Sequence, residues 1–185
     1  MNTKLNFENI LFLDIETVPE TENFQDLSKT KQELFSKKTE YQRKDEISAS
    51  EFYDRAGIWA EFGKIVCISV GFFTNFNSED RKFRVKSFFG EEPSILEEFK
   101  DLLNNHYNKP QHLLCGHNGK EFDFPFIARR MIIHQIELPE KLNLFGTSCS
   151  LVNFFLNTTS NLRLIIKSNF SGSTNSLTHF IDVLT

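Results

Sequence analysis

Cysteine is scarce in this sequence, and no two cysteines lie near each other. Cys67, Cys115 and Cys149 form no C-x-x-C pair among the 185 residues, so neither a zinc site nor a disulfide framework is expected. No apolar run approaches the roughly 18 residues of a membrane span. The N-terminal residues MNTKLNFENI do not resemble a signal peptide. We therefore expect a cytoplasmic protein with no membrane segment.

An excess of positive charge is also missing. The chain has 21 Lys and Arg against 25 Asp and Glu, with a net charge of −4. Binding to nucleic acid would therefore depend on a local basic patch or on bound metal ions. Hydrophobic residues make up 39% of the chain, including 21 Phe, which suits one domain with a substantial core.

Four stretches of the sequence predict β-strands. The first is apolar on both faces, as in a central buried strand. The second and third are joined by a short connection, which favours antiparallel pairing, and the fourth ends in a Gly turn. These stretches are residues 10–13, 64–73, 81–89 and 112–119.

Helices are expected around the fourth strand. Residues 91–107 carry Pro93 near their start and apolar residues on one face, and residues 123–136 follow the Gly turn. The charged segment 19–62 is expected to form one or two surface helices, with Ser48 and Glu51 spaced as a capping box. The order β, β, β, α, β, α predicts an α/β fold with a mixed sheet flanked by helices, in which strands one and four are parallel neighbours.

Composition changes near residue 146. Ser, Thr and Asn account for 18 of the 40 residues from 146 to 185, and Asp182 is the single acid there. We therefore expect residues 1–145 to form the domain and residues 146–185 a divergent tail, which leaves the fold incomplete at its C-terminal end. The apolar residues 162–168 are expected to be the ordered part of the tail, as a substitute edge strand.

Two carboxylates stand at the end of the first predicted strand. Asp14 and Glu16 would point to one side of a strand, about 6.5 Å apart, at the edge where parallel sheets bind ligands. Such a pair is repulsive unless a cation lies between the groups, and oxygen ligands suit Mg²⁺ or Mn²⁺. The alternative is a polar strand end that runs into a turn, and the D-x-E spacing alone leaves both interpretations open.

A second polar group begins where the fourth predicted strand ends. Asp123 could reach the same place as Asp14, because the two strands are expected to be neighbours. Taken alone, Asp123 could be a helix N-cap, and Asn118 with Gly119 an ordinary turn. Taken together, the two groups would bring three carboxylates to adjacent strand ends.

These residues resemble the first two motifs of the DEDD 3′–5′ exonucleases, which have a ribonuclease H-like fold. FLDIETV contains the D-x-E motif, and GHNGKEFD contains the second motif, in which Asn precedes an aromatic residue and Asp. The flanking sequences resemble the bacterial branch related to the proofreading exonuclease domain of family B DNA polymerases. The resemblance covers residues 7–145.

The resemblance implies a two-metal site for Mg²⁺ or Mn²⁺, with the ions about 3.5–4 Å apart. Asp14 would bridge both ions, Glu16 would hold the ion that activates water, and Asp123 would hold the other. The expected reaction releases nucleoside monophosphates from single-stranded 3′ ends, with DNA as the expected substrate.

The resemblance also assigns a substrate role to three neighbouring residues. Thr17, Asn118 and Phe122 would surround the terminal nucleotide, and an aromatic ring can stack on its base. Phe122 could equally be a core residue.

The sequence departs from this family in the third motif. The family completes its site with a fourth carboxylate in Y-x3-D or H-x4-D. All three tyrosines precede Asp123, and neither His134 nor His179 has Asp at the required spacing. Asp182 follows His179 by three residues and fits neither pattern. A truncated or frame-disrupted member of the family, with doubtful turnover, is therefore expected.

The sequence leaves two functions open besides the exonuclease. One is an inactive nuclease-like remnant that binds metal or nucleic acid without turnover. The other is a phosphatase of the haloacid dehalogenase type, because FLDIET faintly resembles D-x-D-x-T with Asp14 as nucleophile. Glu16 departs from that pattern, and HNGKEFD is left unexplained by it.

Overall fold

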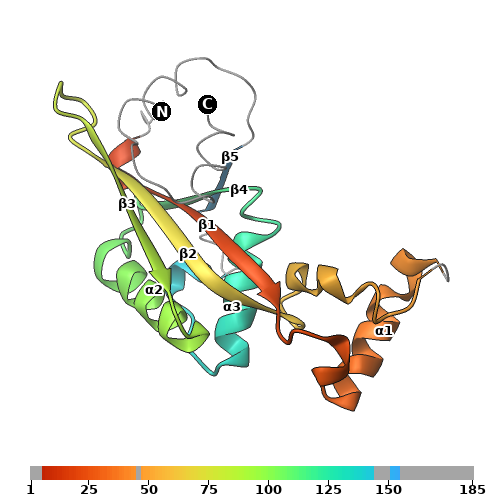
Figure 1. Ribbon diagram of the computed structural model, residues 1–185. Coiled ribbons are helices and arrows are strands. Elements are labelled where there is room, and N and C mark those ends of the chain that lie inside the picture. The colour runs from red at the N-terminus through yellow and green to blue at the C-terminus, as the bar shows by residue number, and fades with distance from the viewer. Residues whose placement is uncertain (1–5, 45–46, 144–150, 155–185) are drawn as a thin grey trace.

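The protein is built around a five-stranded mixed sheet with the strand order β3-β2-β1-β4-β5. The computed structural model describes residues 6–44 and 47–143, and the backbone of residues 151–154. Figure 1 shows β1 crossing the middle of the sheet, with helices α2 and α3 together on one side. None of the helices in the described ranges is long and apolar enough to cross a membrane.

The strand pairing follows the predicted order. β1 (Ile10–Pro19) pairs antiparallel with β2 (Gly63–Thr74), which pairs antiparallel with β3 (Lys82–Phe89). On its other side β1 runs parallel to β4 (Leu113–His117). The antiparallel pairing of the second and third strands and the parallel pairing of the first and fourth are both confirmed.

The fifth strand comes from the segment that was expected to be a divergent tail. β5 (Leu151–Phe154) runs parallel to β4 at the edge of the sheet. This edge was expected to be filled by residues 162–168, whereas Leu151–Phe154 pairs with β4 there. Residues 162–168 and Asp182 lie outside the described residues.

Two helices cover one face of the sheet. α2 (Glu92–His106) has Pro in its first turn, and α3 (Asp123–Ile133) follows the turn after β4. Their apolar faces bury the side of the sheet that carries alternate residues of β1 and β2. The core on this side includes Leu11, Leu13, Ile15, Ile68, Val70, Phe99 and Ile127.

A buried ion pair joins the two helices. Arg130 Nε donates to Glu92 Oε1 at 2.8 Å, and Arg130 Nη2 donates to Glu92 Oε2 at 2.5 Å. Glu92 also accepts from the Ile65 amide at 2.7 Å, and Arg130 donates to the Ala60 carbonyl at 2.9 Å. Burial raises the pKa of Glu92, but hydrogen bonds from Arg130 and Ile65 outweigh it, so the pKa lies below its ordinary value.

Residues 20–62 form an arm with a small core of its own. It contains α1 (Lys29–Arg43), and Phe24–Asp26 and Tyr53–Ile58 are 3-10 turns. Figure 1 shows the arm extending beyond the end of β1. Further 3-10 turns are Phe7–Asn9 and Glu140–Leu142. The small core consists of Leu27, Phe35, Phe52, Tyr53, Ala56 and Phe62.

The predicted capping box in the arm is present, although it does not begin an α-helix. The Ser48 amide donates to the Glu51 carboxylate at 2.8 Å, and the Glu51 amide donates to Ser48 Oγ at 3.2 Å. The chain after it forms the 3-10 turn Tyr53–Ile58. Buried aromatic contacts fix this segment, and they override the local signal for a helix.

Candidate active site

Asp14 and Glu16 lie on the face of the sheet opposite α2 and α3. Leu13 and Ile15 belong to the core under the helices. Phe12 belongs to a separate cluster on the other face. Since side chains alternate along a strand, the two carboxylates share the face of Phe12, where Asp14 is half-buried and Glu16 is exposed.

A β-bulge follows Glu16. Glu16 is opposite Cys67, whereas Thr17 is opposite Ile65, so Val66 is an extra residue on β2. Bulges bend and twist a strand, and they are frequent beside active sites. Thr17 is half-buried and lies on the face of Ile65, away from Asp14 and Glu16.

The turn after β4 positions the start of α3. Asn118 has a φ of 53°, in the left-handed region that Asn tolerates. A Cβ on Gly119 would lie 2.9 Å from the Phe124 ring, so the turn fits closely against the helix. The expected turn at Asn118 and Gly119 is confirmed.

Asp123 is the first residue of α3 and is buried, with 3% of its surface exposed. A Cβ built on Gly116 would lie 3.3 Å from the Leu13 carbonyl oxygen and 3.6 Å from Asp123 Oδ2. The carboxylate therefore lies beside the junction of β1 and β4. Phe122, and not Asp123, occupies the N-cap position, so the N-cap alternative is wrong.

Asp14 and Asp123 interact electrostatically. Burial raises the pKa of Asp123, and the negative charge of Asp14 raises it further, to about 7. The backbone amides of Asp123 and Ile15 favour the charged form and offset part of this effect. The structure thus brings together the two carboxylates that the sequence places at neighbouring strand ends.

Glu16 does not join Asp14 and Asp123 to form a group of three carboxylates. Within residues 6–44 and 47–143, no group of three or more His, Cys, Asp or Glu side chains is arranged to hold a metal ion. Glu16 is exposed on the same strand face as Asp14. Asp14 and Asp123 supply the hard oxygen ligands that suit a divalent ion such as Mg²⁺. The set of three carboxylates expected for two ions is not assembled in the described residues.

The remaining predicted site residues lie around the same turn. Asn118 is exposed. Phe122 is partly buried against the core, with its ring centroid 5.5 Å from that of Phe126. The packing of Phe122 agrees with the alternative that it is a core residue.

Two residues beside Asp14 were missed by the sequence analysis. Ser69 lies directly opposite Asp14 and its Oγ is 2.9 Å from Ser87 Oγ. His117 ends β4 and is exposed, and the pairing of Phe12 with Cys115 places it level with Asp14. The sequence GHNG carried the signal for His117, but its place beside Asp14 depends on the strand register.

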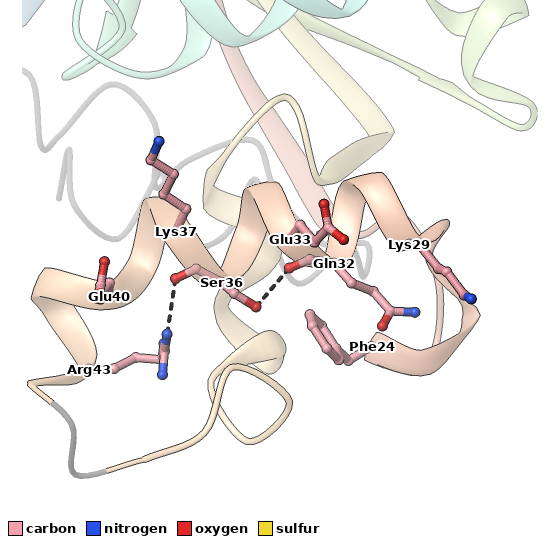
Figure 2. Close-up of a pocket in the computed structure, with 8 residues that line it drawn as sticks. All are labelled: Phe24, Lys29, Gln32, Glu33, Ser36, Lys37, Glu40 and Arg43. Carbon is pink, nitrogen blue, oxygen red and sulfur yellow. Dashed lines mark hydrogen bonds between the residues drawn. The ribbon is translucent and has the colours of Figure 1, made fainter.

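An open groove of about 670 Å³ lies on α1 and not at the carboxylates. Figure 2 shows Lys29, Lys37 and Arg43 along it, with Glu33 and Glu40 among them. Arg43 donates to the carbonyl oxygens of Ser36 and Ile47 within the arm. Its mixed charge gives this groove no clear preference for an anion or a cation.

Comparison with known proteins identifies the family. Residues 52–150, more than half of the chain, match the RNase H superfamily. No curated protein matches. Among solved structures, the chain is similar to a family B DNA polymerase from the archaeon Pyrobaculum calidifontis (15% identity, TM-score 0.42). It is also similar to the zinc-bound E. coli ExoI–ssDNA complex (11% identity, TM-score 0.43).

The likeness to these two structures is distant. They match 78% and 94% of this chain, which spans only 15% and 37% of theirs. The family match covers β2 to β4 and α3, and so includes Asp123. It agrees with the mixed α/β fold expected from the sequence and gives no support to a haloacid dehalogenase. The chain belongs to the RNase H superfamily.

Proposed function

We propose that this chain is a metal-dependent nuclease that removes nucleoside monophosphates from the 3′ end of single-stranded nucleic acid, with DNA as the first substrate to test. The observation that carries the proposal is the pairing of Asp14 with the buried Asp123 at the junction of two parallel strands. Membership of the RNase H superfamily supports a nuclease. The direction of cleavage rests on the sequence motifs around Asp14 and Asp123.

Asp14 and Asp123 would hold the divalent ion. A bound Mg²⁺ or Mn²⁺ stabilises the charge that develops on the oxygens during displacement at phosphorus. The backbone amides of Ile15 and Asp123 stabilise the ionised form of Asp123. Glu16, exposed on the same face as Asp14, is the group available to orient the attacking water. Thr17, Asn118 and Phe122 stay in the proposal as contacts to the terminal nucleotide.

A second candidate function is binding without turnover. It is favoured by the position of Glu16, which forms no metal-binding group with Asp14 and Asp123 in the described part of the chain. In that case the same two aspartates would hold a metal ion through which a nucleic-acid phosphate is bound, and hydrolysis would remain at background level.

The test is hydrolysis of single-stranded DNA and RNA oligonucleotides that carry a label at either the 5′ or the 3′ end. With Mg²⁺ or Mn²⁺, a 3′–5′ exonuclease shortens the 5′-labelled strand in single-nucleotide steps. The same enzyme releases the 3′ label as a mononucleotide. Asp14→Asn and Asp123→Asn should remove this activity, and Glu121→Gln, an exposed acid two residues from Asp123, is the matched control.

Each outcome separates the two functions. Metal-dependent release of mononucleotides that Asp123→Asn abolishes supports the exonuclease. Binding that Asp14→Asn changes, with no product, supports the second candidate. A chain that neither binds nor cleaves any of these oligonucleotides contradicts both.

A further inference from the structure

The face that carries Asp14 and Glu16 continues in register across the sheet to the edge strand. Glu16 is opposite Cys67, and Cys67 is opposite Phe89 on β3. Directly opposed residues lie on the same face of a sheet. With strands about 4.8 Å apart, Phe89 is about 10 Å from β1 on the side of the carboxylates.

Phe89 is one of two exposed aromatic side chains in the described residues. It is 80% exposed, and the other, Tyr41 on α1, is 90% exposed. Phe88, the residue before it, is buried in the core under the helices. Gly90 follows the strand with a φ of 130°, and apart from its two chain neighbours no described residue would come within 4 Å of a Cβ added there. Within the described part of the chain, Phe89 is therefore an exposed aromatic side chain at the end of β3.

A cation lies on the same face, one pair further along β1. Val18 is opposite Lys64, and Val18 is two residues after Glu16, so both side chains point to the side of Glu16. Val18 is 36% exposed, and Lys64 is half-buried. An aromatic ring and an ammonium group thus lie on either side of Cys67 and Glu16, on the sheet face opposite α2 and α3.

We propose that Phe89 and Lys64 hold the single-stranded nucleic acid beside the site, with a nucleobase stacked on the Phe89 ring and a phosphate bound by Lys64. This inference rests on the proposed nuclease function. Stacking of a base on an aromatic side chain tolerates any sequence, because every base has a flat face. Since the chain carries a net charge of −4, a local contact of this kind would help to hold a polyanion.

The test is the affinity for a fluorescent single-stranded oligonucleotide, measured by anisotropy with a chelator present so that no cleavage occurs. Phe89→Ala should raise Kd between about 5-fold and 150-fold, which corresponds to about 1–3 kcal/mol of stacking. Phe89→Trp should keep the affinity, because indole also stacks. Tyr41→Ala removes an equally exposed aromatic residue from α1 and should leave Kd unchanged.

Two further measurements distinguish stacking from a structural effect. An abasic nucleotide, scanned along the oligonucleotide, should weaken binding to the wild-type chain at one position and have no effect there on Phe89→Ala. Lys64→Gln should weaken binding to all sequences and reduce the slope of log Kd against log salt by about one.

The inference is overturned if Phe89→Ala binds as tightly as Tyr41→Ala while the wild-type chain still cleaves or binds the oligonucleotide. In that case the proposed nuclease function stands alone. A wild-type chain that neither binds nor cleaves single-stranded nucleic acid overturns both.

Discussion

Arg130 and Glu92 form a bidentate ion pair inside the protein, with their side chains 4% and 7% exposed. This pair connects α3 to α2, and through Ile65 and Ala60 it also connects both helices to β2 and the turn before it. Because Asp123 is on the same helix as Arg130, the pair helps to fix the position of the helix that carries a site residue.

Removal of one partner of this pair should strongly destabilise the folded protein. Glu92→Ala leaves the Arg130 guanidinium buried without its carboxylate, and we expect a loss of about 3–5 kcal/mol in the free energy of unfolding. Arg130→Met together with Glu92→Leu should recover much of this loss, since no charge is left buried. Urea denaturation of the three chains measures the difference, and an equal loss in the single and double variants would contradict this view.

The pair also makes stability depend on pH. The folded chain holds the pKa of Glu92 below its ordinary value, so the unfolded chain binds the proton more readily. This contribution is present above the ordinary pKa and is lost as the pH falls through the folded value. Glu92→Gln should therefore flatten the stability profile below about pH 5, which thermal melts across this range can record.

Asp123 should have the opposite effect. Its pKa is about 7 in the folded chain and 3.8 in the reference state, so between these values the folded chain holds a proton that the unfolded chain lacks. Stability then falls as the pH rises through this window. In the presence of a chelator, Asp123→Asn should be more stable than wild type at pH 8, by at most about 4 kcal/mol. The two chains should melt alike near pH 3.5.

Divalent ions should reverse that destabilisation. Mg²⁺ or Mn²⁺ between Asp14 and Asp123 would offset their repulsion, so the wild-type melting temperature should rise with ion concentration at pH 8. Asp14→Asn should reduce this rise, and Glu121→Gln should keep it. A rise with Zn²⁺ alone would instead indicate adventitious binding by His or Cys.

Gly119 provides a separate test of how the turn supports Asp123. A Cβ there would lie 2.9 Å from the Phe124 ring, which is fully buried and cannot easily move. Gly119→Ala should cost about 1–3 kcal/mol through overpacking and should displace the start of α3. Asn118→Gly is the control for stability, because Gly adopts the left-handed conformation at no steric cost. Denaturation of both variants checks the comparison.

Strand pairings could be predicted from the sequence where the local pattern of each strand and the connection to its neighbour agree. The apolar run before Asp14 and the Gly turn after β4 predicted β1 beside β4, and the short connection between β2 and β3 predicted their antiparallel pairing. The bulge at Val66 was out of reach, because an extra residue in one strand is defined only by its partner. The Glu92–Arg130 pair was missed for a similar reason, since its two residues are 38 apart in the chain. That Glu16 forms no metal-binding group with Asp14 and Asp123 in the described residues was likewise not readable from the D-x-E spacing.

The basic side chains along the edge strand β3 affect how two molecules of this protein can approach each other. Lys82, Arg84 and Lys86 are exposed on alternate positions of β3, and β2 is the one strand that pairs with it among those described. The outer edge of β3 offers backbone groups that a second chain could use to extend the sheet. Two such edges would bring rows of like charge together, and this repulsion opposes edge-to-edge pairing. Replacement of these three cations with Thr would remove this repulsion and leave β3 as an edge at which two chains can pair.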